Sequence, residues 1–166
     1  MLSMIAAVSS NNKISDGKGI PWLGQMPDEL RHFKGVTIGH TVVMGKNTYL
    51  EMAGPLKNRR NIVLSRKLQE VRDGFELVSE SSTILDLAKK TEVFVIGGGK
   101  IYSLFKDDVE QIYLTVIDLV VPSGVDFISP DYSKWQPIWE RYTKADQDNH
   151  YSAKYSLLRR ASVSRS

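Results

Sequence analysis

Short apolar segments alternate with helical patterns over the first hundred residues, and this alternation restricts the possible fold classes most strongly. The apolar segments are short and rich in Val, Ile and Leu: Leu2–Val8, Thr41–Met44, Asn61–Leu64, Phe75–Val78 and Val93–Ile96. Such runs are typical of strands that are buried on both faces of a parallel sheet. The pattern therefore predicts an α/β fold whose sheet is largely parallel.

Three helical patterns lie between these segments. Pro27–Phe33 opens with Pro followed by two acidic residues, which suits the first turn of a helix. Ser81–Thr83 provides polar capping residues before Ile84–Lys90, whose last turn is basic. We expect a third, short helix over Lys100–Phe105.

The last third of the chain alternates apolar and polar residues. This period of two appears in Gln111–Ile117, Gln136–Thr143 and His150–Leu158, and it predicts antiparallel strands near a sheet edge. The 166 residues suit one domain. We expect that domain over residues 1–158, with 159–166 as a basic tail outside the fold.

Composition excludes several kinds of site. The chain has no cysteine, which rules out disulfides, thiolate zinc sites and iron–sulfur clusters, and its three histidines are far apart, so we expect no metal. A net charge of +3 suits an anionic small ligand at least as well as nucleic acid. The absence of a signal peptide or a long apolar run predicts a cytoplasmic protein without a membrane segment.

Two strand-to-helix junctions suit a phosphate. Gly97–Gly99 follows one apolar segment and precedes a helical pattern, which indicates either close approach to a pyrophosphate or a tight turn. Gly45–Thr48 places a lysine at a similar junction, where it is either a phosphate ligand or a surface residue beside a helix cap. Arg59 and Arg66 bracket another apolar segment, and each is either an anion ligand or part of a solvated rim.

Glu29 is the candidate acid. It precedes Phe33 by four residues, so the two side chains share one helix face. A carboxyl group on an apolar face is either a satisfied buried polar group or a functional acid with a raised pKa. We expect Asp28, one step round the helix, to face water instead. Two loops, 9–23 and 119–135, complete the pattern, and the first has the length of a functional lid.

Seven motifs, in this order, resemble the dihydrofolate reductase family across residues 1–158. They are Ile5–Ala7, Ile20–Trp22, Glu29–Lys34, Val43–Tyr49, Arg59–Arg66, Val95–Tyr102 and Ile112–Asp118. The resemblance implies a single-domain three-layer sandwich, with a mixed, mostly parallel sheet of about eight strands flanked by about four helices. It also implies hydride transfer from NADPH to 7,8-dihydrofolate, giving tetrahydrofolate. The implied partners are dihydrofolate and antifolate inhibitors, without nucleic acid or membrane, and the implied state is a monomer.

The resemblance also assigns roles at the substrate. Glu29 would grip the amidine-like edge of the pterin and favour protonation at N5 through a water that Trp22 orders, while Thr115 steadies the acid. Arg59 would bind the α-carboxylate of the glutamate tail. The implied substrate wall consists of Ile5, Ala6, Leu30, Phe33, Met52, Leu56, Ile96 and Tyr102.

At the cofactor, the resemblance implies three groups of contacts. Around the nicotinamide it implies Ala7, Ile14, Ile20, Ile96 and Tyr102. At the phosphates it implies Gly45, Lys46, Asn47, Thr48, Gly97, Gly98, Gly99, Lys100 and Ile101. Leu64, Ser65 and Arg66 would surround the adenosine 2′-phosphate, which predicts NADPH over NADH.

Three departures from the family pattern stand out. The spacer Leu23–Asp28 is longer than expected, which makes Asp28 the alternative acid. Ser15 replaces a usual glycine in the lid, and Ser123–Ile128 replaces a usual Asp-Thr-x-Phe-Pro run, so we expect a missing hydrogen bond between loop and lid. The rival functions are a same-fold pyrimidine reductase of riboflavin synthesis and a non-catalytic nucleotide-binding module. The reductase would not need an acid facing a core aromatic, so Glu29 discriminates against it. The binding module is disfavoured because the aromatic residues lie in strand and core patterns without an interleaved basic stripe.

Overall fold

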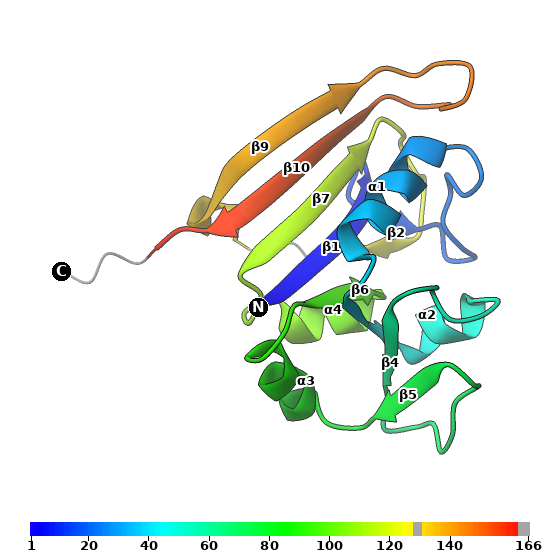
Figure 1. Cartoon of the computed structure of the whole chain (residues 1–166). Helices are drawn as coiled ribbons and strands as arrows, with labels where there is room; N and C mark the ends of the chain where they lie inside the picture. The colour runs from blue at the N-terminus through cyan, green and yellow to red at the C-terminus, as the bar shows by residue number, and fades with distance from the viewer. Residues whose placement is uncertain (128–130, 163–166) are drawn as a thin grey trace.

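The computed structural model describes residues 1–127 and 131–162. Its elements, in chain order, are β1 Leu2–Ser9, β2 Lys13–Ser15, α1 Pro27–Thr37, β3 Thr41–Gly45, α2 Lys46–Glu51, β4 Arg60–Leu64, β5 Phe75–Val78, α3 Ser81–Ala88, β6 Val93–Gly97, α4 Gly99–Phe105, β7 Gln111–Ile117, β8 Val125–Asp126, η1 Tyr132–Lys134, β9 Trp135–Thr143 and β10 Ala153–Arg160. Figure 1 shows how they follow one another in space. Ile128 and Pro130, in the second predicted loop, lie outside the described residues.

The central sheet has eight strands in the order β5-β4-β3-β6-β1-β7-β10-β9. The first six are parallel neighbours, whereas β10 runs antiparallel to both β7 and β9. The predicted mixed, mostly parallel sheet is therefore confirmed.

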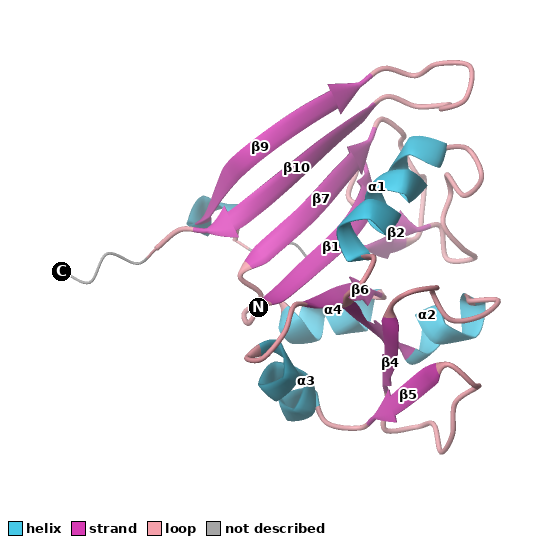
Figure 2. Ribbon diagram, viewed as in Figure 1, coloured by secondary structure: helices cyan, strands magenta, loops and turns pink. Residues whose placement is uncertain are grey.

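Side-chain alternation along the strands builds a core on each face of the sheet. Met4 packs in one cluster with Ile84 of α3 and Phe105 of α4. Its neighbour Ile5 points to the opposite face, into a cluster with Tyr49 of α2 and Phe33 of α1. Helices thus cover both faces, as Figure 2 shows, and the three-layer arrangement is confirmed.

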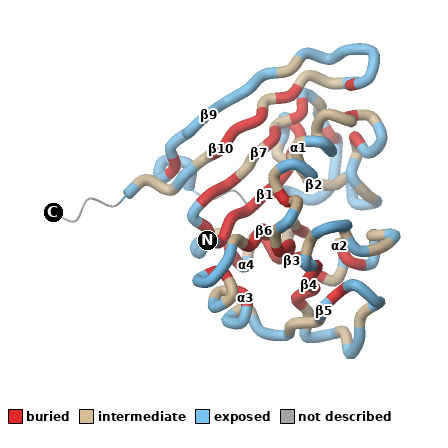
Figure 3. The backbone as a smooth tube through the Cα atoms, viewed as in Figure 1, coloured by how far each residue is buried: buried red, intermediate tan, exposed pale blue. Residues whose placement is uncertain are grey.

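The strand β7 differs from its predicted place. We expected Gln111–Ile117 to be antiparallel and near an edge. Its pairing with β10 is antiparallel as expected, but β7 lies inside the sheet and pairs in parallel with β1 on its other side. A polar residue in this strand does not indicate exposure to bulk solvent, because Thr115 is buried and lines a cleft. The true edge is β9, which Figure 3 shows exposed along most of its length.

Two predicted boundaries also need correction. The α3 helix begins at Ser81, so its serines lie inside the first turn, and Glu80 at the N-cap makes no side-chain capping bond. The folded domain extends past residue 158, because β10 continues through Arg160. The Arg160 guanidinium donates to the Val109 carbonyl at 3.0 Å and stacks 4.7 Å from the Trp135 ring, which fixes it in the fold. Residues 163–166 of the predicted tail lie outside the described residues.

Candidate active site

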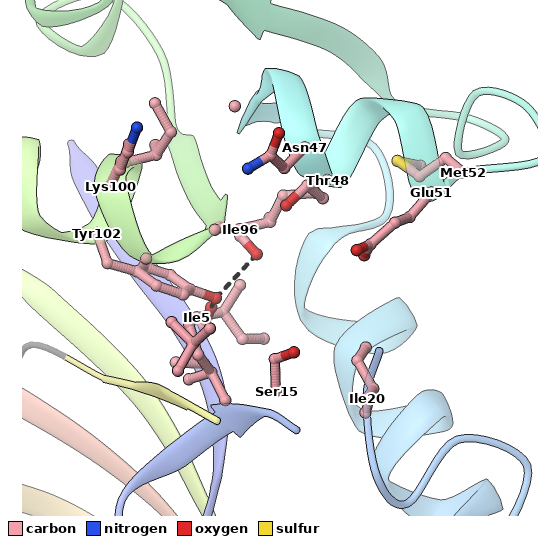
Figure 4. A pocket seen from close by; sticks show the side chains of 18 of the residues that line it. Ile5, Ser15, Ile20, Asn47, Thr48, Glu51, Met52, Ile96, Lys100 and Tyr102 are labelled. Carbon is pink, nitrogen blue, oxygen red and sulfur yellow. Dashed lines mark hydrogen bonds between the residues drawn. The ribbon is translucent and has the colours of Figure 1, made fainter. Parts of the chain in front are cut away.

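A cleft of about 1010 Å³ opens where the parallel strands end. Residues from the carboxyl ends of β1, β3, β4 and β6 line it, including Ala7, Gly45, Leu64 and Ile96. Ligands of open α/β sheets bind at this edge, because the strands stop there and the loops diverge. Figure 4 shows the side chains that surround this space.

The predicted site residues converge on this cleft, with one exception. The predicted catalytic and substrate residues that line it are Ile5, Ala6, Trp22, Glu29, Leu30, Phe33, Met52, Leu56, Ile96, Tyr102 and Thr115. The predicted cofactor residues that line it are Ala7, Ile14, Ile20, Gly45, Lys46, Asn47, Thr48, Leu64, Ser65, Arg66, Gly97, Gly98, Gly99, Lys100 and Ile101. The exception is Arg59, and the roles of all these residues stay predictions.

Glu29 is the half-buried acid of the cleft. It lies in the first turn of α1, which Pro27 opens. Burial raises the pKa of its carboxyl group from 4.5 to about 7, and burial is the only cause of the shift. Within the described residues, no cation or hydrogen-bond donor therefore offsets the loss of water around this group. The geometry leaves an acid that can exchange a proton near neutral pH.

Asp28, the alternative acid, lies outside the cleft lining. Its carboxylate forms an ion pair with Arg31 and accepts a hydrogen bond from the Asn149 amide at 3.1 Å. Its backbone N–H also donates to Asn149, so the residue joins the start of α1 to the loop before β10. These bonds indicate that Asp28 has a structural role, in which it holds the start of α1 against the loop before β10.

Tyr102 connects the two central strands at the floor of the cleft. Its hydroxyl oxygen lies 2.8 Å from the carbonyl oxygens of both Ile5 and Ile96, and Figure 4 draws the bond to Ile96. Burial and the negative charge of Glu29 raise the pKa of this hydroxyl. The hydroxyl proton can go to one carbonyl at a time, so each oxygen keeps acceptor capacity for a ligand.

Close backbone approach explains several glycines at the other end of the cleft. A Cβ atom on Gly45 would lie 2.7 Å from the Ile101 side chain, and one on Gly98 would lie 3.4 Å from the Thr48 hydroxyl. Gly97 also adopts a φ of +126°, which L side chains rarely adopt. The backbone between β6 and α4 is consequently open to a ligand, with Lys46 and Lys100 beside it. This cradle fits an anion.

Arg66 stands at a third strand end. It follows β4 and lines the cleft together with Ser65 and Lys67. The Ser65 hydroxyl accepts the Lys67 N–H at 3.1 Å, which shapes the turn. The Arg66 guanidinium pairs with Glu80 at 2.9 Å, and three quarters of its side chain is exposed, so it remains accessible.

Arg59 does not line the cleft. It donates to the Thr37 hydroxyl and to the Lys57 carbonyl, each at 3.0 Å. Burial lowers the pKa of its guanidinium. Thr37 and Lys57 are close in sequence to Phe33 and Leu56, which do line the cleft.

Sequence reasoning missed several lining residues. They include His32, Glu51, Lys67, Ser79, Ser81 and Leu104. His32 carried a usable signal, because it follows Glu29 by three residues on the same helix face. Its ring packs 4.9 Å from the ring of Tyr155, and burial together with the charge of Arg141 lowers its pKa. The serines had no such signal, since they reach the cleft only through the pairing of β5 with β4.

The lid and the facing loop are bonded, contrary to the expected missing hydrogen bond. Strand β2 in the lid pairs with β8, and the Phe127 N–H donates to the Asn12 carbonyl at 2.9 Å. The Lys13 ammonium adds an ion pair with Asp126 at 2.7 Å. A Cβ on Gly124 would lie 1.9 Å from the Ser15 carbonyl oxygen, so the absence of a side chain permits this contact.

Within residues 1–127 and 131–162, no three His, Cys, Asp or Glu side chains gather as a metal site, and no helix is long and apolar enough to cross a membrane.

Comparison with known proteins gives a consistent result. A family model described as dihydrofolate reductase matches residues 1–160. Dihydrofolate reductase type 3 of Salmonella typhimurium is 37% identical over 163 residues, which cover 96% of this chain and 98% of that protein. Dihydrofolate reductase of Haemophilus influenzae is 31% identical over 158 residues, covering 95% and 98%.

A solved structure of dihydrofolate reductase from Enterococcus faecalis, complexed with NADP(H) and RAB-propyl, superposes with a TM-score of 0.89 at 29% identity. The superposition covers 98% of this chain and 97% of that one. Together with the family match over nearly the whole length, this establishes that the chain belongs to the dihydrofolate reductase family.

Proposed function

We propose that this chain transfers a hydride from NADPH to 7,8-dihydrofolate, giving tetrahydrofolate. Membership of the dihydrofolate reductase family supports the reaction. The observation that carries the site assignment is Glu29, a half-buried acid that lines the cleft and whose pKa is raised to about 7 by loss of solvent. A carboxyl group of this kind can both bind an amidine-like heterocycle and accept or release a proton at neutral pH.

The substrate end combines flat apolar walls with this acid. Leu30 and Phe33 on α1 face Met52 and Leu56 across the cleft, and a heterocycle between them would have its polar edge toward Glu29. Trp22 is buried and lines the same space, where its indole N–H would hold the water that delivers a proton to N5. Thr115 on β7 lines the same space; within the described residues it forms no hydrogen bond with Glu29, so its proposed part is to contact the substrate beside the acid. Arg59 would bind the glutamate α-carboxylate through its third guanidinium nitrogen, since its hydrogen bonds to Lys57 and Thr37 use the other two.

The other end of the cleft fits the cofactor. When bound, NADPH supplies the hydride. Gly97–Gly99 and the facing Lys46, Asn47 and Thr48 would hold its pyrophosphate, and Ala7, Ile14 and Ile20 would enclose its nicotinamide. Hydride transfer needs two rings in contact with water excluded, so orientation and lid closure are the chain's main contributions. Ser65 and Arg66 would bind the 2′-phosphate, which favours NADPH over NADH.

The proposed setting is a cytoplasmic monomer that binds dihydrofolate and antifolate inhibitors rather than nucleic acid. Two observations support it: the lack of cysteine and an anion-binding cleft sized for small molecules. Light scattering of the purified protein measures its molar mass in solution and so tests the monomer. A mass twice that of the chain would contradict it.

The decisive experiment measures NADPH consumption with and without dihydrofolate. We expect turnover only when both are present, and no turnover at any pH would reject the enzyme. Glu29→Gln should keep NADPH binding but lose rate at neutral pH, with partial recovery in acid where the substrate is already protonated. Asp28→Asn is the matched control, and it should retain the rate. If Asp28→Asn loses the rate instead, the acid is misassigned.

A further inference from the structure

Arg66 and Glu80 meet at the edge of the cleft because the strands β4 and β5 end together. Leu64 and Val78 are paired in register, and the Ser65 N–H donates to the Val78 carbonyl at 2.9 Å. The two following segments therefore run side by side. Arg66 and the neighbours of Glu80, Ser79 and Ser81, all line the cleft. The guanidinium and carboxylate form an ion pair at 2.9 Å, with side chains 75% and 55% exposed.

We infer that Glu80 is a specificity-determining residue, whose carboxylate competes with the 2′-phosphate of the cofactor for Arg66 and weakens the preference for NADPH over NADH. The inference rests on the proposed function, because it needs Arg66 to contact that phosphate. Glu80 itself does not line the cleft, so its effect on a cofactor without the phosphate is small.

Two opposing effects decide whether Glu80 weakens or strengthens the binding of NADPH. By holding Arg66 in place, Glu80 could in principle help phosphate binding, but an ion pair this exposed contributes little order. Repulsion is larger: a phosphate and a carboxylate on one guanidinium stand roughly 7 Å apart. The phosphate carries about two negative charges, so this separation disfavours binding about seven-fold in water at low salt and about two-fold at physiological salt. Competition therefore outweighs positioning.

The nearby charges do not cancel this repulsion. Lys67 also lines the cleft, and among the described residues it forms no ion pair that would offset its positive charge. Lys46 and Lys100 line the cleft as well, after β3 and in α4. These cations attract the cofactor whether or not Glu80 is replaced, whereas Glu80 acts on Arg66 directly.

The test compares dissociation constants of NADPH and NADH, measured by quenching of tryptophan fluorescence, for the intact chain and Glu80→Gln. We expect NADPH to bind about two-fold more tightly at physiological salt and up to about seven-fold more tightly at low salt, with NADH unchanged. Glu76→Gln is the matched control. It breaks a similar ion pair, with Arg60, between the same two strands, and neither partner lines the cleft. It should leave both constants unchanged.

Arg66→Ala separates the two possible failures. If this variant keeps the full preference for NADPH, the phosphate contact in the proposed function is wrong. If Arg66→Ala erodes the preference while Glu80→Gln weakens NADPH binding or leaves it unchanged, the phosphate contact stands and the inference about Glu80 is overturned.

Discussion

Replacing Glu29 by glutamine should stabilise the ligand-free protein, and more so as the pH rises. Burial raises the pKa of this carboxyl group from 4.5 to about 7, so the folded state holds its proton more tightly than the unfolded chain does. Stability from the protonated form is fully present below pH 4.5 and is lost as the pH rises through about 7. Glutamine, with no proton to lose, escapes this loss.

The magnitude follows from the size of the shift. Each pKa unit corresponds to about 1.4 kcal/mol, so the rise from 4.5 to about 7 amounts to about 3 kcal/mol once the group is ionised in the fold. At pH 5 only a small part of this difference is expressed. The gain of Glu29→Gln in free energy of unfolding should therefore grow from about 1 kcal/mol at pH 5 to about 3 kcal/mol at pH 8.

Urea unfolding across this pH range measures the gain directly. Asp28→Asn is the control, because its carboxylate bonds Arg31 and Asn149 outside the cleft. We expect it to lower the free energy of unfolding by about 1 kcal/mol, without a gain at high pH. A gain of Glu29→Gln that stays constant or shrinks between pH 5 and pH 8 would refute the reasoning, since a satisfied or solvated acid behaves in that way.

Two further substitutions probe the walls of the cleft. The Arg72 guanidinium donates to the carbonyls of Tyr49 and Met52, each at 2.8 Å. Arg72→Met should therefore lower the free energy of unfolding by about 2 kcal/mol, which urea unfolding measures. It should also raise the KM for dihydrofolate more than it changes kcat, which steady-state kinetics measures. Gly124 has a φ of +152° and lies against the Ser15 carbonyl, so Gly124→Ala should cost about 1–3 kcal/mol and increase proteolytic cleavage of the lid; an uncleaved lid would contradict that contact.

Much of the fold follows from local patterns. The strands β3, β4 and β6 bury nearly every residue, and continuous apolar runs reveal such strands without knowledge of their neighbours. Helical spacing likewise put Glu29 and Phe33 on one face before any contact was known, and both line the cleft. These features depend on one element at a time, so the sequence suffices for them.

The errors arise where an element's surroundings matter. Alternation in β7 suggested a sheet edge, but β7 lies inside the sheet and one of its polar residues, Thr115, lines the cleft. The end of the domain was placed too early because Arg160 reads as part of a basic tail, although it caps the Val109 carbonyl and stacks on Trp135. In both cases the deciding partner is distant in sequence.

The division of charge within the cleft shows the same dependence on topology. Lys46, Arg66 and Lys100 follow three different strands, and they meet because β4, β3 and β6 are parallel neighbours that end at one edge. Glu29 reaches the same cleft from α1, and burial is the cause of its raised pKa. A cation beside Glu29 would lower that pKa and leave the acid ionised at neutral pH. The parallel strands bring the cations together at one edge, whereas Glu29 enters the cleft from a separate helix. This arrangement depends on the assembled fold and cannot be derived from any one segment of the sequence.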